Sequence, residues 1–390
     1  MDDVRNPFAP GAGNQPPELA GRQAILQQAR TILARVEQGR HAKSFMLVGL
    51  RGVGKTVLLN RILEIAEERQ LSAHMLEAPE EKPLPELLVP PLRKILFRLD
   101  RAGQANAIVR RGLRILTGFA KALKVKYGDM EVGLDIEPVA GVGDSGDLQN
   151  DLPELLVAVG EAAKARNTAV VLLIDELQYI AEDELSALIM GIHKASQKQL
   201  PLVLIAAGLP QLVGNMGRSK SYAERLFEFI EIGPLQRKDA ATALVDPIQK
   251  EGERIAKAAV DAIVADTQGY PFFLQTWGYH AWNAAVKSPI SVSDVAAARP
   301  KILASLDGSF FRVRFDRLTP GEKRYLRAMA ERGPGPHRSG DIAETLGVKV
   351  QSVAPTRSNL IRKGMIYTPA HGDTAFTVPL FDEFMKRQVP

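Results

Sequence analysis

Residues 49–56 read Gly49-Leu50-Arg51-Gly52-Val53-Gly54-Lys55-Thr56, which is the G-x-x-x-x-G-K-[ST] pattern of a phosphate-binding loop. Residues 44–48, just before the loop, are apolar and predict a strand. Residues 57–63, just after it, predict a helix. Because strand, loop and helix follow one another in the order that the motif requires, the sequence favours a nucleotide site over an ordinary glycine-rich turn.

The types of residue in this loop suit the binding of a phosphate group. Glycines let the backbone wrap closely around a phosphate, and the N-terminus of the following helix favours negative charge. Lys55 is expected to reach the β- and γ-phosphates of ATP, and Thr56 to offer its hydroxyl to Mg²⁺. The cofactor-binding residues predicted here are Gly49, Gly52, Val53, Gly54, Lys55, Thr56 and Val57.

The second half of an ATP site is expected at the end of another buried strand. Residues 169–174 are all apolar and lead directly into Asp175 and Glu176. We expect Asp175 to hold Mg²⁺, usually through water, and Glu176 to orient or deprotonate the attacking water. An acidic pair that merely opens a surface helix is the alternative, but the phosphate loop upstream favours the catalytic interpretation.

The rest of the sequence excludes several classes of protein. No Asn is followed by Lys, so the Asn-Lys-x-Asp pattern that reads guanine is missing and ATP is expected rather than GTP. The chain has no cysteine, which excludes disulfides, thiolate catalysis and Cys-based zinc sites. The apolar segments are too short to span a bilayer, and the first residues do not resemble a signal peptide. We therefore expect a cytoplasmic protein with no membrane partner.

A chain of 390 residues is too long for one ordinary core, so two or three domains are expected. Strands alternate with helices through residues 1–234, which predicts an α/β fold with a parallel sheet sandwiched by helices. An insertion at residues 77–150 interrupts the alternation. It is expected to hold helices at 84–99 and 105–123 and a hairpin around Gly128-Asp129.

The last two parts of the chain have a different pattern. Residues 235–310 predict helices alone and form an expected helical lid. Residues 311–390 predict a helix, a helix–turn–helix and two short strands, which is the pattern of a winged helix. Capping boxes that start at Ser291 and Thr319 mark two of the helix starts. A small-molecule kinase stays possible, but it would leave the lid and the winged helix unexplained.

The positive charge of the chain points to a nucleic-acid partner. The net charge is +5 over the whole chain, whereas residues 312–390 alone hold 14 Lys/Arg and 8 Asp/Glu. This asymmetry indicates a C-terminal domain that faces duplex DNA. The expected DNA contacts, near the third helix of that domain, are Arg357, Arg362 and Lys363. A module that docks on protein is the alternative.

With these features in place, the chain resembles bacterial AAA+ ATPases close to the archaeal origin-recognition and STAND-type ATPases, over nearly its whole length. Besides the phosphate loop and the winged helix, the resemblance is carried by Pro16-Pro17-Glu18-Leu19-Ala20-Gly21-Arg22, Leu173-Ile174-Asp175-Glu176-Leu177-Gln178, Ala207-Gly208-Leu209-Pro210, Tyr222-Ala223-Glu224-Arg225-Leu226-Phe227 and Gly269-Tyr270-Pro271.

The resemblance implies roles for residues outside the phosphate loop. It places Leu19 and Arg22 beside the adenine and closes the lid over the nucleotide. It also implies a homo-oligomer in which Arg225 is an arginine finger offered to the neighbour's ATP, although Arg218 is an equal candidate by chemistry.

Two departures from the family pattern bear on the rate of hydrolysis. Residues 202–207 lead into Gly208 with no polar residue to sense the γ-phosphate, and the lid sequence Gly269-Tyr270-Pro271-Phe272-Phe273 lacks the arginine of many AAA+ members. Both departures imply slow hydrolysis. The predicted function is therefore an ATP-dependent, DNA-associated switch, and the alternative is a STAND-like signalling ATPase whose winged helix binds protein.

Overall fold

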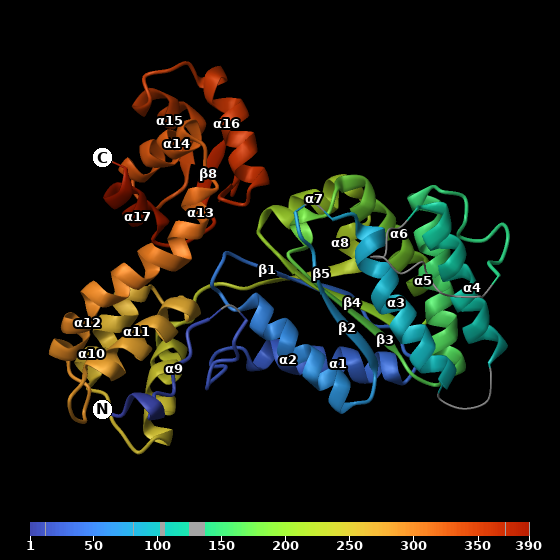
Figure 1. Ribbon diagram of the computed structural model, residues 1–390, viewed down its shortest axis with the longest axis horizontal. Helices are drawn as coiled ribbons and strands as arrows, with labels where there is room; N and C mark the ends of the chain where they lie inside the picture. The colour runs from blue at the N-terminus through green and yellow to red at the C-terminus, as the bar shows by residue number, and fades with distance from the viewer. Residues whose placement is uncertain (12, 81, 102–105, 125–136, 371, 390) are drawn as a thin grey trace.

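The structure is a computed structural model that describes residues 1–11, 13–80, 82–101, 106–124, 137–370 and 372–389. It consists of an α/β core, a middle helical unit and a C-terminal unit, and the two smaller units lie on the same side of the core (Figure 1). The hairpin expected around Gly128-Asp129 lies outside the described residues.

The core is built on a five-stranded parallel sheet in the order β2-β3-β4-β1-β5. The strands are β1 (Ser44–Val48), β2 (Ser72–Glu77), β3 (Val170–Asp175), β4 (Leu202–Gly208) and β5 (Phe227–Glu231). The apolar runs of β1, β3 and β4 are buried along their whole length, as expected for the central strands of a parallel sheet. The predicted α/β class is confirmed.

Helices cover both faces of the sheet and form two separate apolar clusters with it. One face is covered by α1 (Gln23–Glu37) and α2 (Lys55–Glu68). The other face carries α3 (Leu84–Arg101), α4 (Ala107–Ala122), α5 (Leu148–Ala165), α6 (Glu182–Gln197) and α7 (Gln211–Ser219). The two helices expected within the insertion are present as α3 and α4.

The segment after β3 turns sharply before the next helix. A 3-10 helix (Leu177–Tyr179) comes first, and α6 begins only at Glu182. Glu176 has φ +53°, a left-handed conformation that cannot continue into a right-handed helix. This turn directs the Glu176 side chain back toward the phosphate loop.

The middle unit contains only helices, namely α9 (Arg237–Lys250), α10 (Lys257–Thr267), α11 (Pro271–Ala284) and α12 (Val292–Ser305). The first residues of the chain pack on α11. The ring of Phe8 is buried against Gly278, where an added Cβ would lie 2.7 Å from the ring. The Asn6 side chain donates to the carbonyl oxygen of Tyr279 at 2.9 Å.

The C-terminal unit follows a π-helix (Leu306–Phe311). It comprises α13 (Arg312–Asp316), α14 (Pro320–Glu331), α15 (Ser339–Thr345), α16 (Val350–Arg362) and α17 (Phe381–Gln388), with strands β6 (His337–Arg338), β7 (Ile366–Tyr367) and β8 (Asp373–Phe376). The strands form an antiparallel sheet in the order β6-β8-β7. Both predicted capping boxes, at Ser291 and Thr319, are present.

The middle and C-terminal units share a single apolar cluster, which runs from α9 to α17. Aromatic rings join them at the π-helix, where the Phe311 centroid lies 6.4 Å from that of Phe273 and 5.2 Å from that of Phe384. Because this core is continuous, the two units are expected to behave as one body. Among the described residues, no helix is both long and apolar enough to cross a membrane.

Candidate nucleotide site

The phosphate loop (residues 49–56) connects β1 to α2 with the backbone geometry that an anion cradle needs. Gly52 has φ +79° and Gly54 has φ +92°, conformations that favour glycine. Gly54 is the N-cap of α2 and gives it no side-chain cap, so the first N–H groups of that helix have no side-chain acceptor there. At Gly49 a Cβ would lie 2.1 Å from the carbonyl oxygen of Ile232, which leaves room for glycine alone.

The ammonium group of Lys55 is buried beneath the loop. Only 7% of the residue is exposed, and its Nζ donates to the carbonyl oxygens of Gly49 and Leu50, both at 2.9 Å. Burial lowers the pKa of Lys55 to about 8, and the nearby Glu176 and Asp175 carboxylates oppose that shift. The group is held at the base of the cradle, where a bound phosphate would meet it.

Thr56 and Asp175 meet across the interface between α2 and the end of β3. The Thr56 hydroxyl donates to Asp175 Oδ2 at 2.6 Å, and the Glu176 N–H donates to Asp175 Oδ1 at 2.8 Å. Burial raises the pKa of Asp175, while the hydrogen bond from Thr56 opposes the rise. A hydroxyl and a carboxylate side by side are the hard oxygen ligands that Mg²⁺ prefers, so these residues fit a magnesium nucleotide.

Both carboxylate oxygens of Glu176 are held by side chains of the same chain. Oε1 forms an ion pair with Arg51 Nη1 at 3.1 Å, and Oε2 accepts a hydrogen bond from the Gln178 amide. The Arg51 Nη2 also donates to the hydroxyl of Tyr179 at 2.6 Å. The sequence analysis missed the contacts of Glu176 with Arg51 and Gln178 and the contact of Arg51 with Tyr179, although Arg51 stands in the middle of the phosphate loop itself.

Gln178 also places a polar side chain beside the end of β4. A Cβ on Gly208 would lie 2.8 Å from Gln178 Oε1, and that oxygen accepts the N–H of Leu209 at 2.9 Å. Gln178 therefore bridges the end of β4 and Glu176.

Arg22 lies against the phosphate loop. Its Nη2 donates to the carbonyl oxygens of Val53 at 3.2 Å and Gly233 at 2.5 Å. Burial lowers the pKa of Arg22. Leu19 is half-buried beside the cluster that includes Val53. Their contact with adenine stays a prediction.

Arg225 lies in the short helix α8 (Ala223–Leu226), where its side chain is exposed and forms no ion pair among the residues that the structure describes. Arg218 is also exposed, but it bonds to Asn215 at 2.7 Å and lies 4.0 Å from a carboxylate oxygen of Glu182. The role of arginine finger stays a prediction for both.

The two smaller units both contact the backbone of the phosphate loop. The N–H of Phe272, at the start of α11, donates to the carbonyl oxygen of Gly52 at 3.1 Å. The N–H of Arg51 donates to the carbonyl oxygen of Thr377, in the C-terminal unit, at 3.0 Å. A Cβ on Gly364 would lie 3.0 Å from the Tyr179 hydroxyl, so the C-terminal unit also packs closely beside the Glu176 cluster.

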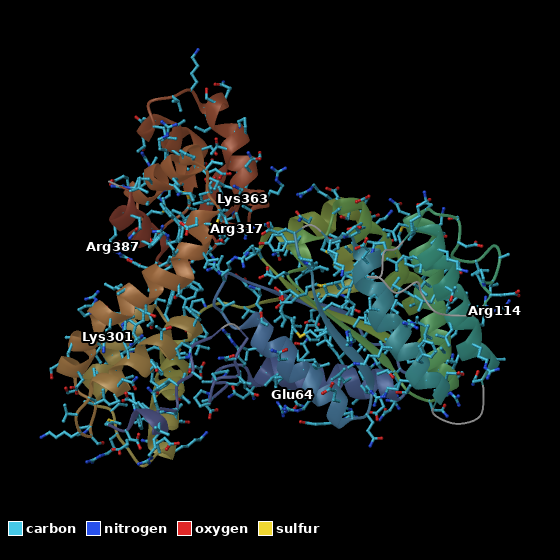
Figure 2. All side chains as sticks on the ribbon, in the orientation of Figure 1. Glu64, Arg114, Lys301, Arg317, Lys363 and Arg387 are labelled. Carbon is cyan, nitrogen blue, oxygen red and sulfur yellow. The ribbon has the colours of Figure 1, made fainter. Side chains whose placement is uncertain are left out.

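All three predicted DNA contacts have partners inside the C-terminal unit. Arg357 donates to the hydroxyls of Thr374 at 2.9 Å and Thr368 at 2.6 Å. Lys363 forms an ion pair with Glu322 at 2.7 Å and lies on the side that faces the core (Figure 2). Arg362 is exposed and bonds only to the nearby Asn359 among the described residues. It is the member of the set best placed for an external partner.

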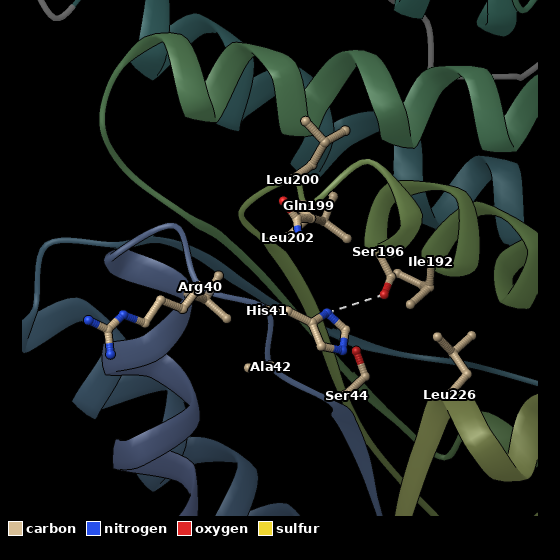
Figure 3. Close-up of a pocket in the computed structure, with 11 residues that line it drawn as sticks. Arg40, His41, Ala42, Ser44, Ile192, Ser196, Gln199, Leu200, Leu202 and Leu226 are labelled. Atoms are coloured by element: carbon tan, nitrogen blue, oxygen red, sulfur yellow. Dashed lines mark hydrogen bonds between the residues drawn. The ribbon is translucent and has the colours of Figure 1, made fainter.

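Another pocket lies at the opposite end of the sheet and does not extend this site. It is lined by residues at the starts of β1 and β4, where the hydroxyl of Ser196 lies 3.3 Å from Nδ1 of His41 (Figure 3). Its volume of about 10 Å³ is room for one water at most.

Comparison with known families agrees with the geometry of the core. Residues 18–205 match the family described as AAA ATPase domain. The phosphate loop and the Asp175-Glu176 pair both lie within the matched residues. ATP hydrolysis is therefore the activity that the match supports for the core, with nucleotide and a divalent metal as its cofactors. Residues 308–385 match a domain of unknown function, and no curated protein matches the chain.

Solved structures also align with nearly the whole chain. Orc1 from Aeropyrum pernix, solved in complex with DNA, has a TM-score of 0.47 and 16% identity, covering 98% of this chain and 96% of that one. Cdc6p from Pyrobaculum aerophilum has a TM-score of 0.46 and 16% identity, and the alignment covers 100% of this chain and 99% of that one. The RuvB Holliday junction branch migration motor from Thermotoga maritima has a TM-score of 0.46 and 15% identity, and the alignment covers 97% of this chain and 100% of that one.

Lys55→Met removes the buried ammonium group, and we expect two effects. Nucleotide affinity should fall at least tenfold, because a charge that meets the phosphates is lost. The nucleotide-free variant should be more stable than the wild type at pH 7, by up to about 3 kcal/mol, because a buried charge with a lowered pKa disfavours folding.

The stability difference has a defined pH dependence. Between pH 8 and 10.5 the unfolded chain binds more protons at Lys55 than the folded chain does, so wild-type stability rises relative to the variant over that window. Urea unfolding of both proteins at pH 7 and pH 10 measures this. A difference that stays constant with pH would contradict the assignment of a buried, charged Lys55.

Arg51→Met should raise the rate of ATP hydrolysis several-fold. The substitution removes the ion pair that holds one oxygen of Glu176 and leaves the loop glycines and Lys55 in place. Steady-state turnover at saturating ATP is the measurement, and Arg51→Lys, which keeps the charge, is the matched control. A turnover below that of the wild type would show that Arg51 assists the reaction instead of restraining Glu176.

Proposed function

We propose that this chain is a slow ATPase that acts as a nucleotide-dependent switch and associates with duplex DNA through a C-terminal winged helix. The proposed domains are an ATPase domain over residues 1–234, a helical lid over 235–310 and a winged helix over 311–390. The observation that carries the proposal is the hydrogen bond from the Arg51 N–H to the Thr377 carbonyl oxygen. It joins the phosphate loop to the C-terminal unit directly.

The residues of the core divide the chemistry of hydrolysis among them. Bound ATP with Mg²⁺ supplies the phosphoryl group that is transferred to water. Lys55 and the N–H groups of the loop bind the phosphates, and Thr56 and Asp175 hold the metal. Glu176 orients water and accepts its proton, which requires a carboxylate oxygen that is free of Arg51 or Gln178.

The contacts of Glu176 support slow turnover. In this conformation both of its oxygens are engaged, one by an ion pair and one by a hydrogen bond. Releasing one oxygen costs the charge-assisted contact, which is about 1.5 to 3 kcal/mol before any compensation. Such a barrier suits a protein that remains in one nucleotide state long enough for the state to be read.

The distribution of positive charge supports association with DNA. Besides the C-terminal unit, residues 84–124 hold nine Lys/Arg and two Asp/Glu, a second basic region that the charge analysis of the sequence overlooked. Lys94 and Arg98 of α3 are exposed, have no carboxylate partner among the described residues, and line an open groove of about 810 Å³ with Phe97. Unpaired cations and an aromatic ring suit contacts with a nucleic-acid backbone.

Homo-oligomerisation is part of the proposal and rests on the exposure of Arg225, which can reach a neighbouring subunit as an arginine finger. The alternative function is a STAND-like signalling ATPase. It is favoured by the internal partners of Arg357 and Lys363, which leave fewer cations for DNA on α16.

Glu176→Gln tests the switch. The amide cannot accept the proton of water, so hydrolysis should stop while nucleotide binding persists. With ATP, the variant should show a DNA affinity different from that of the same protein with ADP, by about threefold or more. Fluorescence anisotropy with a labelled duplex measures the DNA affinity with each nucleotide. Equal DNA affinities with ATP and with ADP would show that the nucleotide does not control DNA binding.

Lys94→Glu/Arg98→Glu and Arg362→Gln test the two basic surfaces separately. Each loss of a phosphate contact should weaken DNA binding at every sequence and reduce the slope of log affinity against log salt by about 0.9. Lys301→Gln is the control, because this exposed cation lies on the middle unit away from both surfaces (Figure 2). If no variant changes the affinity or the slope, or if the wild type does not bind duplex DNA, the protein-docking alternative gains support.

A further inference from the structure

A cavity of about 550 Å³ opens beside the phosphate loop, between the core and the C-terminal unit. Arg51, Glu176 and Tyr179 line it from the core. Facing them are Arg314 and Arg317, from the start of the C-terminal unit, together with Lys363. Glu176 therefore lies on the wall of this cavity.

The cations in this cavity are not equivalent. Three of them have carboxylate partners: Arg51 with Glu176, Arg317 with Glu80, and Lys363 with Glu322. Arg314 has none among the described residues, and the one remaining carboxylate of the lining, Glu77, is exposed and also unpaired there. The guanidinium of Arg314 donates to the carbonyl oxygen of Phe310 and lies 4.3 Å from the centroid of its ring.

In this arrangement no carboxylate among the described residues pairs with the positive charge of Arg314. A buried guanidinium loses hydration, and a carbonyl oxygen and an aromatic face replace only part of it. Burial lowers the pKa of Arg314 to about 10, and the positive charge of Arg51 lowers it further in the same direction, so the group stays protonated at neutral pH. A protonated, poorly compensated cation that faces a second cation favours an anion between or beside them.

A series of direct contacts also connects Arg314 to the phosphate loop. The N–H of Phe272 donates to Gly52, and its ring stacks on that of Phe310 with a centroid distance of 4.4 Å and an angle of 24°. Phe310 in turn holds Arg314 through its carbonyl oxygen and its ring. The π-helix that ends at Phe311 sets this geometry, and such segments are frequent at functional sites.

We propose that Arg314 contacts the terminal phosphate of ATP bound to the phosphate loop of the same chain and so distinguishes the triphosphate from the diphosphate. The inference rests on the proposed nucleotide binding and assigns a residue to the phosphate-sensing role that neither the end of β4 nor the start of α11 fills. Because Arg314 begins the C-terminal unit and contacts Phe310 of the π-helix that follows the middle unit, the contact would report the nucleotide state to both units.

The test compares affinities for ADP and for a non-hydrolysable ATP analogue, measured by calorimetry on the full chain. Arg314→Ala should lower the affinity for the ATP analogue about tenfold or more, because one charge-assisted contact is lost. Its affinity for ADP should stay within about twofold of the wild-type value. Arg314→Lys should recover part of the loss. The matched control is Arg312→Ala, since Arg312 lies on the same helix but is exposed and ion-paired with Asp316 at 2.9 Å.

The outcomes separate this inference from the proposed function. The terminal-phosphate contact is overturned if Arg314→Ala lowers the affinities for ADP and for the analogue equally, or if it lowers neither. A wild type that binds neither nucleotide, or a Lys55→Met variant that binds both normally, overturns the nucleotide site itself. Melting temperatures of all variants accompany the titrations, and if Arg314→Ala is unfolded, the same comparison is made with Arg314→Gln, whose uncharged side chain keeps more of the volume.

Discussion

The buried ammonium group of Lys55 is the constraint around which the site is organised. A charge placed there without partners would cost several kcal/mol, so the loop must turn its own carbonyl oxygens inward and the ends of β1 and β3 must lie close enough to bring two carboxylates near it. The strand order meets this need, because one strand alone, β4, separates β1 from β3. The left-handed glycines and the contact between Thr56 and Asp175 follow from the same requirement.

Arg51 connects this charged centre to the rest of the molecule. Its side chain holds Glu176 and Tyr179, and its backbone N–H bonds to Thr377, so one residue of the phosphate loop touches both the Glu176 carboxylate and the C-terminal unit. A ligand that changes the position of this residue acts on chemistry and on domain contact together. This dual role requires no long pathway, because each step is a direct contact.

What the sequence predicted correctly was local, and what it missed was tertiary. The phosphate loop, the strand ahead of Asp175 and both capping boxes depend on spacing within a few residues, which patterns of residue type capture. The partners of Glu176 depend on its left-handed backbone, and the position of Arg314 depends on rings that are brought together by packing between units. Neither signal exists in a linear pattern. The cations of α16 were visible in the sequence, but the internal partners of Arg357 and Lys363 were not, and a charge sum over the whole chain concealed the basic region at residues 84–124.

The way the three parts are joined suits the proposed nucleotide switch. The middle and C-terminal units share one apolar cluster, whereas the clusters of the core are separate from it. Among the described residues, their backbone hydrogen bonds to the phosphate loop are those at Gly52 and at Arg51, each worth about 1 kcal/mol net. A charged ligand can compete with contacts of that size, whereas it cannot disrupt a continuous apolar core. The expected response to nucleotide is therefore a change in how the joined units sit on the loop, with both units kept intact.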